Sequence, residues 1–279
     1  MSRNVKGTKV KSWSELLDCI SNADIHVDAV DELKATARSL DSAAILSGSF
    51  VDLAASDGYS CSMIWPLLTS GRWSGLCVEM DPHKFAKLSY LYSRFDDVSL
   101  ARQKVTPLNV CGLLEAHLVR RDFELLNLDI DSYDLAVLAA ILDGGFRPRV
   151  ISLEINEKIP PPILFEVKYD DQHYWNGDHF YGCSLASAQE ALSARGYVLL
   201  SMVGSNAQYV EESVAPQNIR FPTPEEAYDT GYRKLPDRSI KFSYNSDVQH
   251  WLELEPAHAE SQIREFFSKY DGKFKLSRE

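Results

Sequence analysis

The chain has 279 residues, of which 45% are hydrophobic and 25% charged, so it can bury a sizeable core. The formal net charge of −11 argues against duplex nucleic acid as the main partner, because phosphate backbones need a basic face. No apolar run approaches the ~18 residues that span a bilayer, so we expect a cytoplasmic protein without a membrane partner. The 5 cysteines are scattered, which disfavours a disulfide framework or a structural zinc site.

Residues 1–47 predict an N-terminal helical extension. Apolar residues recur at helical spacing in 12–23 and again in 27–40. The sequence leaves open whether these helices form a lid or the contact of a homodimer.

From residue 48, short apolar runs alternate with amphipathic stretches. Runs typical of strands cover 49–54, 74–80, 98–105, 123–131 and 149–156, and helical patterns cover 61–71, 82–95, 109–119 and 132–145. This alternation indicates βαβ units and a parallel sheet.

A long, aromatic segment follows, and we expect it to form an active-site loop near 157–182. A helix at 184–196 and two strands, at 197–204 and 206–213, complete the pattern. We therefore predict an α/β fold over residues 48–215. It is a Rossmann-like doubly wound sheet, mostly parallel with an antiparallel edge strand. Residues 216–279 predict a C-terminal extension of helices and loops.

Carboxylates stand where the predicted strands end, which is where ligands bind in open parallel sheets. The alternative is that these acids cap the helices that follow, favoured by the helix dipole. The acids are Asp52, Glu79, Asp81, Asp129, Asp131, Asp134 and Glu154.

The turn after the first strand carries Gly58 and an acid, Asp57. Small residues let a ligand approach the backbone, but the acid would repel a pyrophosphate and suits an ammonium or sulfonium group. Glu79, at the end of the second strand, can accept hydrogen bonds from both hydroxyls of a ribose. The missing G-x-G-x-x-G pattern weakens the reading as a dinucleotide-dependent oxidoreductase.

The stretches FVDLAASDGYS, GRWSGLCVEMDP, LLNLDIDSYDLAVLAAIL and RPRVISLEIN together resemble the class I S-adenosylmethionine-dependent methyltransferases. Within them, the likeness is to the FkbM-like group and covers about residues 48–212. It implies S-adenosylmethionine as cofactor and a small-molecule acceptor, which we expect to be methylated at oxygen. The cofactor contacts that it implies are Asp52, Ala54, Ser56, Gly58, Glu79, Met80, Asp81, Val105, Thr106 and Asp129.

Within that resemblance, Asp52 and the turn through Gly58 would face the methionine part of the cofactor, and Glu79 would bind the ribose. The stretch 104–106 would lie against adenine, and Asp129 would lie under the transferable methyl. Ala54 departs from the family, which usually has glycine there. This departure motivates the alternative of a catalytically inactive methyltransferase-like scaffold or binding protein.

Methyl transfer is an in-line displacement in which the enzyme positions the nucleophile and removes its proton. We predict Asp129 and His173 as catalytic residues, with His173 as the preferred general base in the aromatic loop. In the alternative interpretation, His173 is an ordinary surface histidine without a catalytic role. Asp129, Asp131 and Glu154, with Asp134 beside them, are candidate oxygen ligands of a divalent metal such as Mg²⁺. In the alternative, Asp129 orients the substrate directly and no metal binds.

Overall fold

The fold is seen in a computed structural model, which describes residues 27–60, 62–217 and 219–278 together with residues 12, 14, 15 and 18. Most of the helix predicted at 12–23 therefore lies outside the described residues. The helix predicted at 27–40 is confirmed as α2 (Val27–Ser42). Within the described ranges, no helix is both long enough and apolar enough to cross a membrane.

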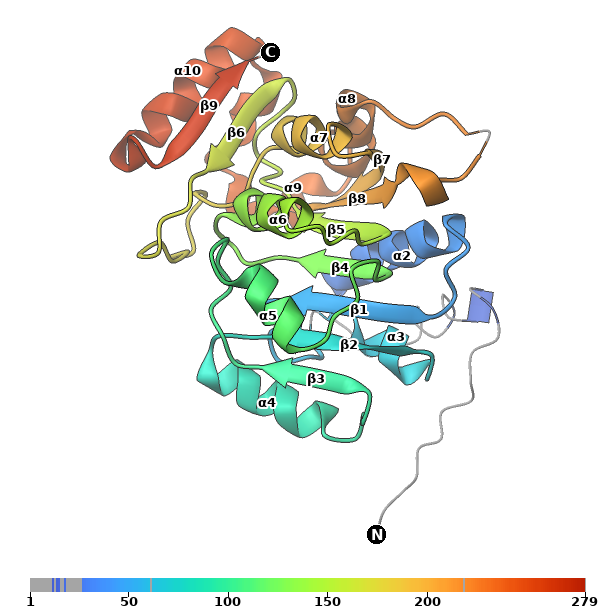
Figure 1. The fold of residues 1–279 in the computed structure, drawn as a ribbon. Helices are drawn as coiled ribbons and strands as arrows, with labels where there is room; N and C mark the ends of the chain where they lie inside the picture. The colour runs from blue at the N-terminus through green and yellow to red at the C-terminus, as the bar shows by residue number, and fades with distance from the viewer. Residues whose placement is uncertain are drawn as a thin grey trace.

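A seven-stranded sheet forms the centre of the molecule (Figure 1). The first five strands of the chain pair in parallel, and β8 pairs antiparallel with both β5 and β7. The predicted doubly wound, mostly parallel sheet is thus confirmed. In spatial order the strands are β3 (Val98–Ala101), β2 (Trp73–Val78), β1 (Gly48–Leu53), β4 (Leu125–Leu128), β5 (Val150–Glu154), β8 (Asn206–Glu211) and β7 (Tyr197–Val203).

Helices cover both faces of the sheet, because successive strand residues point to opposite faces. Phe50 of β1 packs in one core and its neighbour Val51 packs in the other. The core with Phe50 includes α2, α3 (Trp65–Thr69) and α4 (Pro82–Tyr92). The core with Val51 includes α5 (Val110–Ala116), α6 (Asp134–Asp143) and α7 (Leu185–Ser193).

Local sequence explains where several of these helices begin. Asp81 precedes α4, and its Oδ1 accepts hydrogen bonds from the backbone N–H groups of His83 and Lys84, both at 2.8 Å. Ser184 caps α7 in the same way. Helix α3 is shorter than the predicted 61–71, because Pro66 lies in its first turn and the helix ends at Thr69.

The segment 157–182 differs from the predicted loop, because part of it is a strand, β6 (Ile163–Val167). This strand pairs antiparallel with β9 (Phe274–Arg278), in the extension predicted to hold helices and loops. Beside them lies α10 (Pro256–Phe266), and the three elements share an aromatic core (Figure 1). The extension also contains η1 (Glu212–Val214), α8 (Pro224–Tyr228), η2 (Asp229–Arg233), α9 (Arg238–Lys241), η3 (Ser243–Asn245), η4 (Gln249–Glu253) and η5 (Ser268–Tyr270).

Candidate functional site

Three cavities lie at the carboxyl end of the sheet, where the strand order reverses between β1 and β4. The central cavity, of about 430 Å³, is lined by Asp52, Glu79 and Asp129 among others. The side cavity, of about 60 Å³, contains Val105 and Tyr133. The outer cavity, of about 330 Å³, lies on the other side of the acids that follow β4. Ala54, Met80 and Tyr174 line both the central and the side cavity.

The turn after β1 adopts an unusual backbone conformation. Ala54, Ser56 and Gly58 have φ values of 73°, 52° and 76°, in the left-handed region that favours glycine. At Gly58 a side chain is also excluded by space, because a Cβ would lie 2.5 Å from Leu88 Cδ1. The turn therefore holds backbone strain at Ala54 and Ser56, and both residues line the central cavity.

Glu79 connects this turn to the start of α4. Its Oε2 accepts a hydrogen bond from the N–H of Ser56 at 2.9 Å, and its Oε1 accepts one from the N–H of Asp81 at 2.7 Å. The carboxylate is buried, and each oxygen keeps a second lone pair. Glu79 therefore holds the wall of the central cavity in shape and can still accept hydrogen bonds from a ligand.

Asp52 is 2% exposed and shares a hydrogen bond with a residue that the sequence analysis missed. Asn127 Nδ2 donates to Asp52 Oδ1 at 2.8 Å, and Asn127 Oδ1 is buried without a partner among the described residues. Burial raises the pKa of Asp52 to about 6, against the lowering effect of the Asn127 bond, and the charge of Glu79 raises it further. The signal for Asn127 was an amide inside the otherwise apolar strand LLNL.

Asp129, Asp131 and Glu154 are brought together, as the sequence predicted for a metal site. One oxygen of each carboxylate lies within 4.8 Å of the others, and we call these three residues the acidic cluster. Burial raises the pKa of Asp129 and of Glu154 well above its usual range, and the neighbouring negative charges raise both further. Glu154 is 7% exposed, its carboxyl shares a hydrogen bond with that of Asp129, and among the described residues no N–H or hydroxyl group donates to its Oε2.

Asp134 has a different role from the acidic cluster. Its carboxylate accepts hydrogen bonds from the N–H of Ile130 at 2.8 Å and of Ser132 at 3.0 Å. These bonds close the bend in which Asp131 has a φ of 54°. For Asp134 the structure therefore supports the alternative given above: this strand-end acid holds the start of the next helix.

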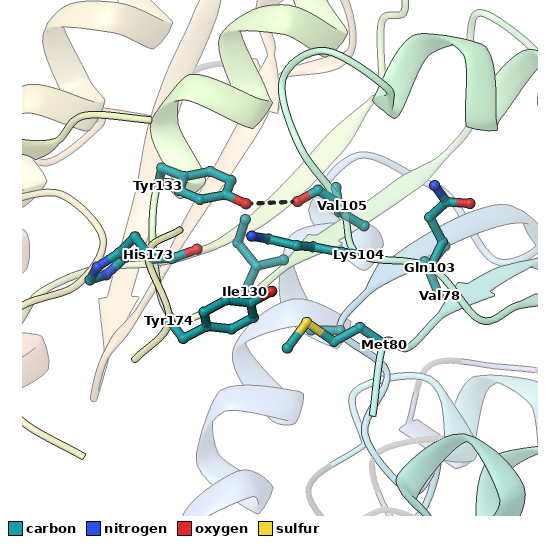
Figure 2. A pocket seen from close by; sticks show the side chains of 11 residues that line it. Val78, Met80, Gln103, Lys104, Val105, Ile130, Tyr133, His173 and Tyr174 are labelled. Atoms are coloured by element: carbon teal, nitrogen blue, oxygen red, sulfur yellow. Dashed lines mark hydrogen bonds between the residues drawn. The ribbon is translucent and has the colours of Figure 1, made fainter. Parts of the chain in front are cut away.

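One wall of the side cavity is formed by contacts between Lys104, in the segment that follows β3, and Tyr174, in the aromatic segment 157–182 (Figure 2). The ammonium of Lys104 lies 4.3 Å from the ring centre of Tyr174, and it also donates to the backbone oxygen of Asp171. On the opposite wall, Tyr133 Oη donates to the backbone oxygen of Val105 at 3.2 Å. A small, mostly apolar space therefore lies beside the central cavity.

Five predicted site residues do not line the central cavity, and two of them, Val105 and Glu154, line the side and the outer cavity respectively. His173 lines the side cavity, where burial lowers its pKa and its ring meets the edge of Phe180. The hydroxyl of Thr106 accepts a hydrogen bond from the N–H of Asn109 and lies outside the lining of all three cavities. Gly58 packs against α4 and lines none of the three. The roles predicted for these residues stay predictions.

No protein-family model and no curated protein matches the chain. Among solved structures, it is similar to the N-terminal domain of EvdMO1 determined in the presence of SAH and D-fucose. The identity is 13% and the TM-score is 0.43, over 74% of this chain and 99% of that chain. It is also similar to a S-adenosylmethionine-dependent methyltransferase from Clostridium acetobutylicum, with 12% identity and a TM-score of 0.40, over 71% and 97% of the two chains.

The glycopeptide N-methyltransferase MtfA, complexed with sinefungin, is a third similar structure. Its identity is 13% and its TM-score 0.39, over 73% of this chain and 98% of that chain. Values this low carry no argument about cofactor or reaction. Those have to be argued from the residues of the site itself.

Proposed function

We propose that this protein is a S-adenosylmethionine-dependent methyltransferase that methylates a small molecule at oxygen. The observation that carries the proposal is the charge of the central cavity. Six acidic side chains line it beside one ammonium, that of Lys84, and the six are those of Glu32, Asp52, Glu79, Asp81, Asp129 and Asp131. Such a lining repels phosphates and favours a cation, and a sulfonium is the cation that a cofactor of this kind carries.

The residues present fit the parts of this cofactor. Glu79 has lone pairs for the ribose hydroxyls, in the position where open sheets use an acid that way. Asp52 and the unpartnered Oδ1 of Asn127 suit the ammonium of the methionine part. Met80 and Val105 offer apolar contacts to a flat base in the side cavity. When bound, S-adenosylmethionine supplies an electrophilic methyl group on positively charged sulfur.

Oxygen is favoured over nitrogen as the methyl acceptor by the acidic cluster. Carboxylates stabilise a protonated amine, and an ammonium has no lone pair with which to attack a methyl group. A hydroxyl instead donates to a carboxylate, which draws its proton away as the oxygen–carbon bond forms. In the balanced reaction, the oxygen–carbon bond replaces the sulfur–carbon bond and the hydroxyl proton passes to a carboxylate.

The acidic cluster also fits a divalent metal, because hard cations prefer carboxylate oxygens and the three groups already converge. Asp129, Asp131 and Glu154 would each supply one ligand. Metal binding would also relieve the repulsion between these neighbouring acids. A fall in apparent Mn²⁺ affinity of at least tenfold in Asp131→Asn, measured by electron paramagnetic resonance, would support this site, and unchanged Mn²⁺ binding would contradict it.

The test of the cofactor is a calorimetric titration with S-adenosylhomocysteine, with and without Mg²⁺. We expect a Kd in the micromolar range, and no saturable binding in either condition would contradict the proposal. The second candidate, a methyltransferase-like scaffold, is favoured by the strained Ala54 in the cavity wall. Binding of S-adenosylhomocysteine without methyl transfer to any acceptor would support it.

A further inference from the structure

A further cavity lies at the opposite end of the sheet from the proposed cofactor site. Its volume is about 560 Å³, and it shares no lining residue with the central, side or outer cavity. The residues at the beginning of β1, β2 and β3 line it, together with the segment 117–120, which follows α5. We call it the amino-end cavity. The inference that follows concerns this cavity alone and does not depend on the proposed function.

The floor of the amino-end cavity is polar, although the face of a sheet that helices cover is usually apolar. On the face that α5 covers, β1 presents Val51 to the core. Nearer the amino end, Ser49 lies on the same face and pairs with Ser74 of β2, because residues two apart in a strand point to one side. Ser99 of β3 also lies there, since it pairs with Leu76 of this core. Helix α5 has only 7 residues, and these serines line an open cavity beyond it.

One ion pair in the wall of the cavity is complete. Glu124 is 8% exposed, and its Oε2 accepts hydrogen bonds from the N–H of Ser49 at 2.6 Å and from the hydroxyl of Ser49 at 2.9 Å. Its Oε1 accepts a hydrogen bond from Arg120 Nη2 at 2.8 Å. Gly48 makes room for this carboxylate, because a Cβ there would lie 2.4 Å from Glu124 Oε2. The charges of Glu124 and Arg120 therefore offset each other within the wall.

Two opposite charges in the same wall have no partner. Among the described residues, no side-chain hydrogen bond and no ion pair within 4.0 Å involves Arg72 or Asp97, and the two do not pair with each other. The hydroxyls of Ser74 and Ser99 have no hydrogen-bond partner in the same part of the chain. The cavity therefore offers a guanidinium, a carboxylate and two hydroxyls to a ligand that carries both charges itself.

The rim of the cavity adds an apolar side chain in an unusual position. Leu118 has a φ of 57°, the left-handed conformation that glycine most often takes after a helix. Its side chain is 89% exposed and borders the cavity beside Val119. Contact with an apolar part of a ligand would remove this side chain from water, which is favourable, and would account for a leucine at this position.

We propose that the amino-end cavity binds a free α-amino acid with an apolar side chain. The carboxylate of the ligand pairs with Arg72 and its ammonium pairs with Asp97, while the serine hydroxyls of the floor hydrogen-bond to either group. The side chain of the ligand packs against Leu118 and Val119. A ligand with a single charge satisfies only one of the two unpaired groups, and Asp97 repels phosphates and other multiply charged anions.

The test follows the backbone amide signals of the full chain by NMR as L-leucine is added, with and without S-adenosylhomocysteine. We expect a Kd of about 1 mM or below, which is ordinary for a ligand of about nine non-hydrogen atoms. The signals of Ser99 and Leu118 should shift, whereas the signal of Ser56 in the central cavity should not.

Three related compounds separate the parts of the ligand. N-acetyl-L-leucine lacks the ammonium, L-leucinamide lacks the carboxylate, and L-alanine lacks most of the apolar side chain. The two compounds with a single charge should bind at least tenfold more weakly than L-leucine. L-alanine should bind at least threefold more weakly, because it cannot reach the rim.

Two variants assign the charges. Arg72→Gln should weaken binding of L-leucine at least fivefold and remove the difference between L-leucine and L-leucinamide, because the group that recognises the carboxylate is gone. Asp97→Asn should likewise remove the difference between L-leucine and N-acetyl-L-leucine. Arg102→Gln and Asp96→Asn are the matched controls, at exposed positions outside the cavity, and should change neither difference.

The proposal is overturned if L-leucine shifts no signal at the amino-end cavity or if both variants bind L-leucine as the wild type does. It is also overturned if either compound with a single charge binds as tightly as L-leucine, since the cavity would then recognise one charge alone. The titration without S-adenosylhomocysteine keeps this result separate from the proposed function. Failure of S-adenosylhomocysteine to bind would overturn that function and leave the outcome for L-leucine unaffected.

Discussion

The central and outer cavities share two residues but are built from different parts of the molecule. The central cavity is made mainly by strand ends and the short turns that follow them, supported on both faces of the sheet. The outer cavity is also lined by two strand-end acids, Asp131 and Glu154, but most of its wall comes from the segment 158–181 together with Ser205 and Tyr244. That segment is held by β6, β9 and α10, which have an aromatic core of their own. The difference indicates that the outer cavity depends more on this aromatic core than the central cavity does, although Tyr174 and Trp175 of the same segment also line the central cavity.

Of the variants considered, Phe267→Ala should show the largest difference between the outer cavity, which it disturbs, and the central cavity, which it leaves intact. Phe267 is buried in the aromatic core shared by β6, β9 and α10, against Phe165, Phe180 and Phe274. Its truncation should lower the free energy of local unfolding of this aromatic core by about 3–5 kcal/mol. Hydrogen exchange would measure this loss, and calorimetry should find the Kd for S-adenosylhomocysteine within twofold. The neighbouring, half-exposed Phe266 supplies the control, Phe266→Ala, with a much smaller loss.

Asp52→Asn, in the wall of the central cavity, should change how the free energy of unfolding depends on pH. The folded pKa of about 6 lies above the usual value of 3.8 for an aspartate. The folded state therefore binds more protons between these values and loses stability as pH rises through them. At pH 7 the ionised carboxylate costs up to about 3 kcal/mol, which the amide removes. Urea unfolding should find Asp52→Asn more stable than the wild type at pH 7 and equally stable at pH 4. Asp96→Asn, at an exposed position, should show no such difference, and a pH-independent advantage of Asp52→Asn would contradict the assignment.

Glu79→Ala should weaken S-adenosylhomocysteine binding by about 2–3 kcal/mol, because it removes charged hydrogen bonds to the turn and to the ribose. Glu79→Gln keeps one acceptor oxygen and should lose less. The exposed Glu253 supplies the control variant Glu253→Ala. Retention of full affinity in Glu79→Ala would refute the ribose assignment.

Ala54→Gly should have the smallest effect and the opposite sign. Relief of the left-handed conformation at Ala54 is worth about 1 kcal/mol. We expect tighter binding of S-adenosylhomocysteine, by up to about fivefold, since the methyl group leaves the cavity wall. Ala55→Gly, in the same turn without a positive φ, should weaken stability instead. Equal effects of the two variants would argue against strain at Ala54.

Sequence patterns predicted the central cavity well, because strand ends follow from apolar periodicity and their acids then share one edge. Beyond the end of β3, Val105 lines the side cavity whereas Thr106 bonds to the N–H of Asn109, and the cofactor contacts predicted for both stay predictions. The outer cavity could not be predicted in this way. Its support depends on pairing between Phe165 and Leu276, which are far apart in the chain, and neither strand has a distinctive local pattern.

The pairing of β6 with β9 has a consequence for the order in which the protein is made. Chains fold from the N-terminus as they are synthesised, and the strands of the large sheet all precede β9. The central cavity can therefore form while the partner of β6 is still missing. A nascent chain would therefore contain the central cavity before the outer cavity had its full wall. Only translation through residue 278 supplies the strand that pairs with β6 and supports the outer cavity.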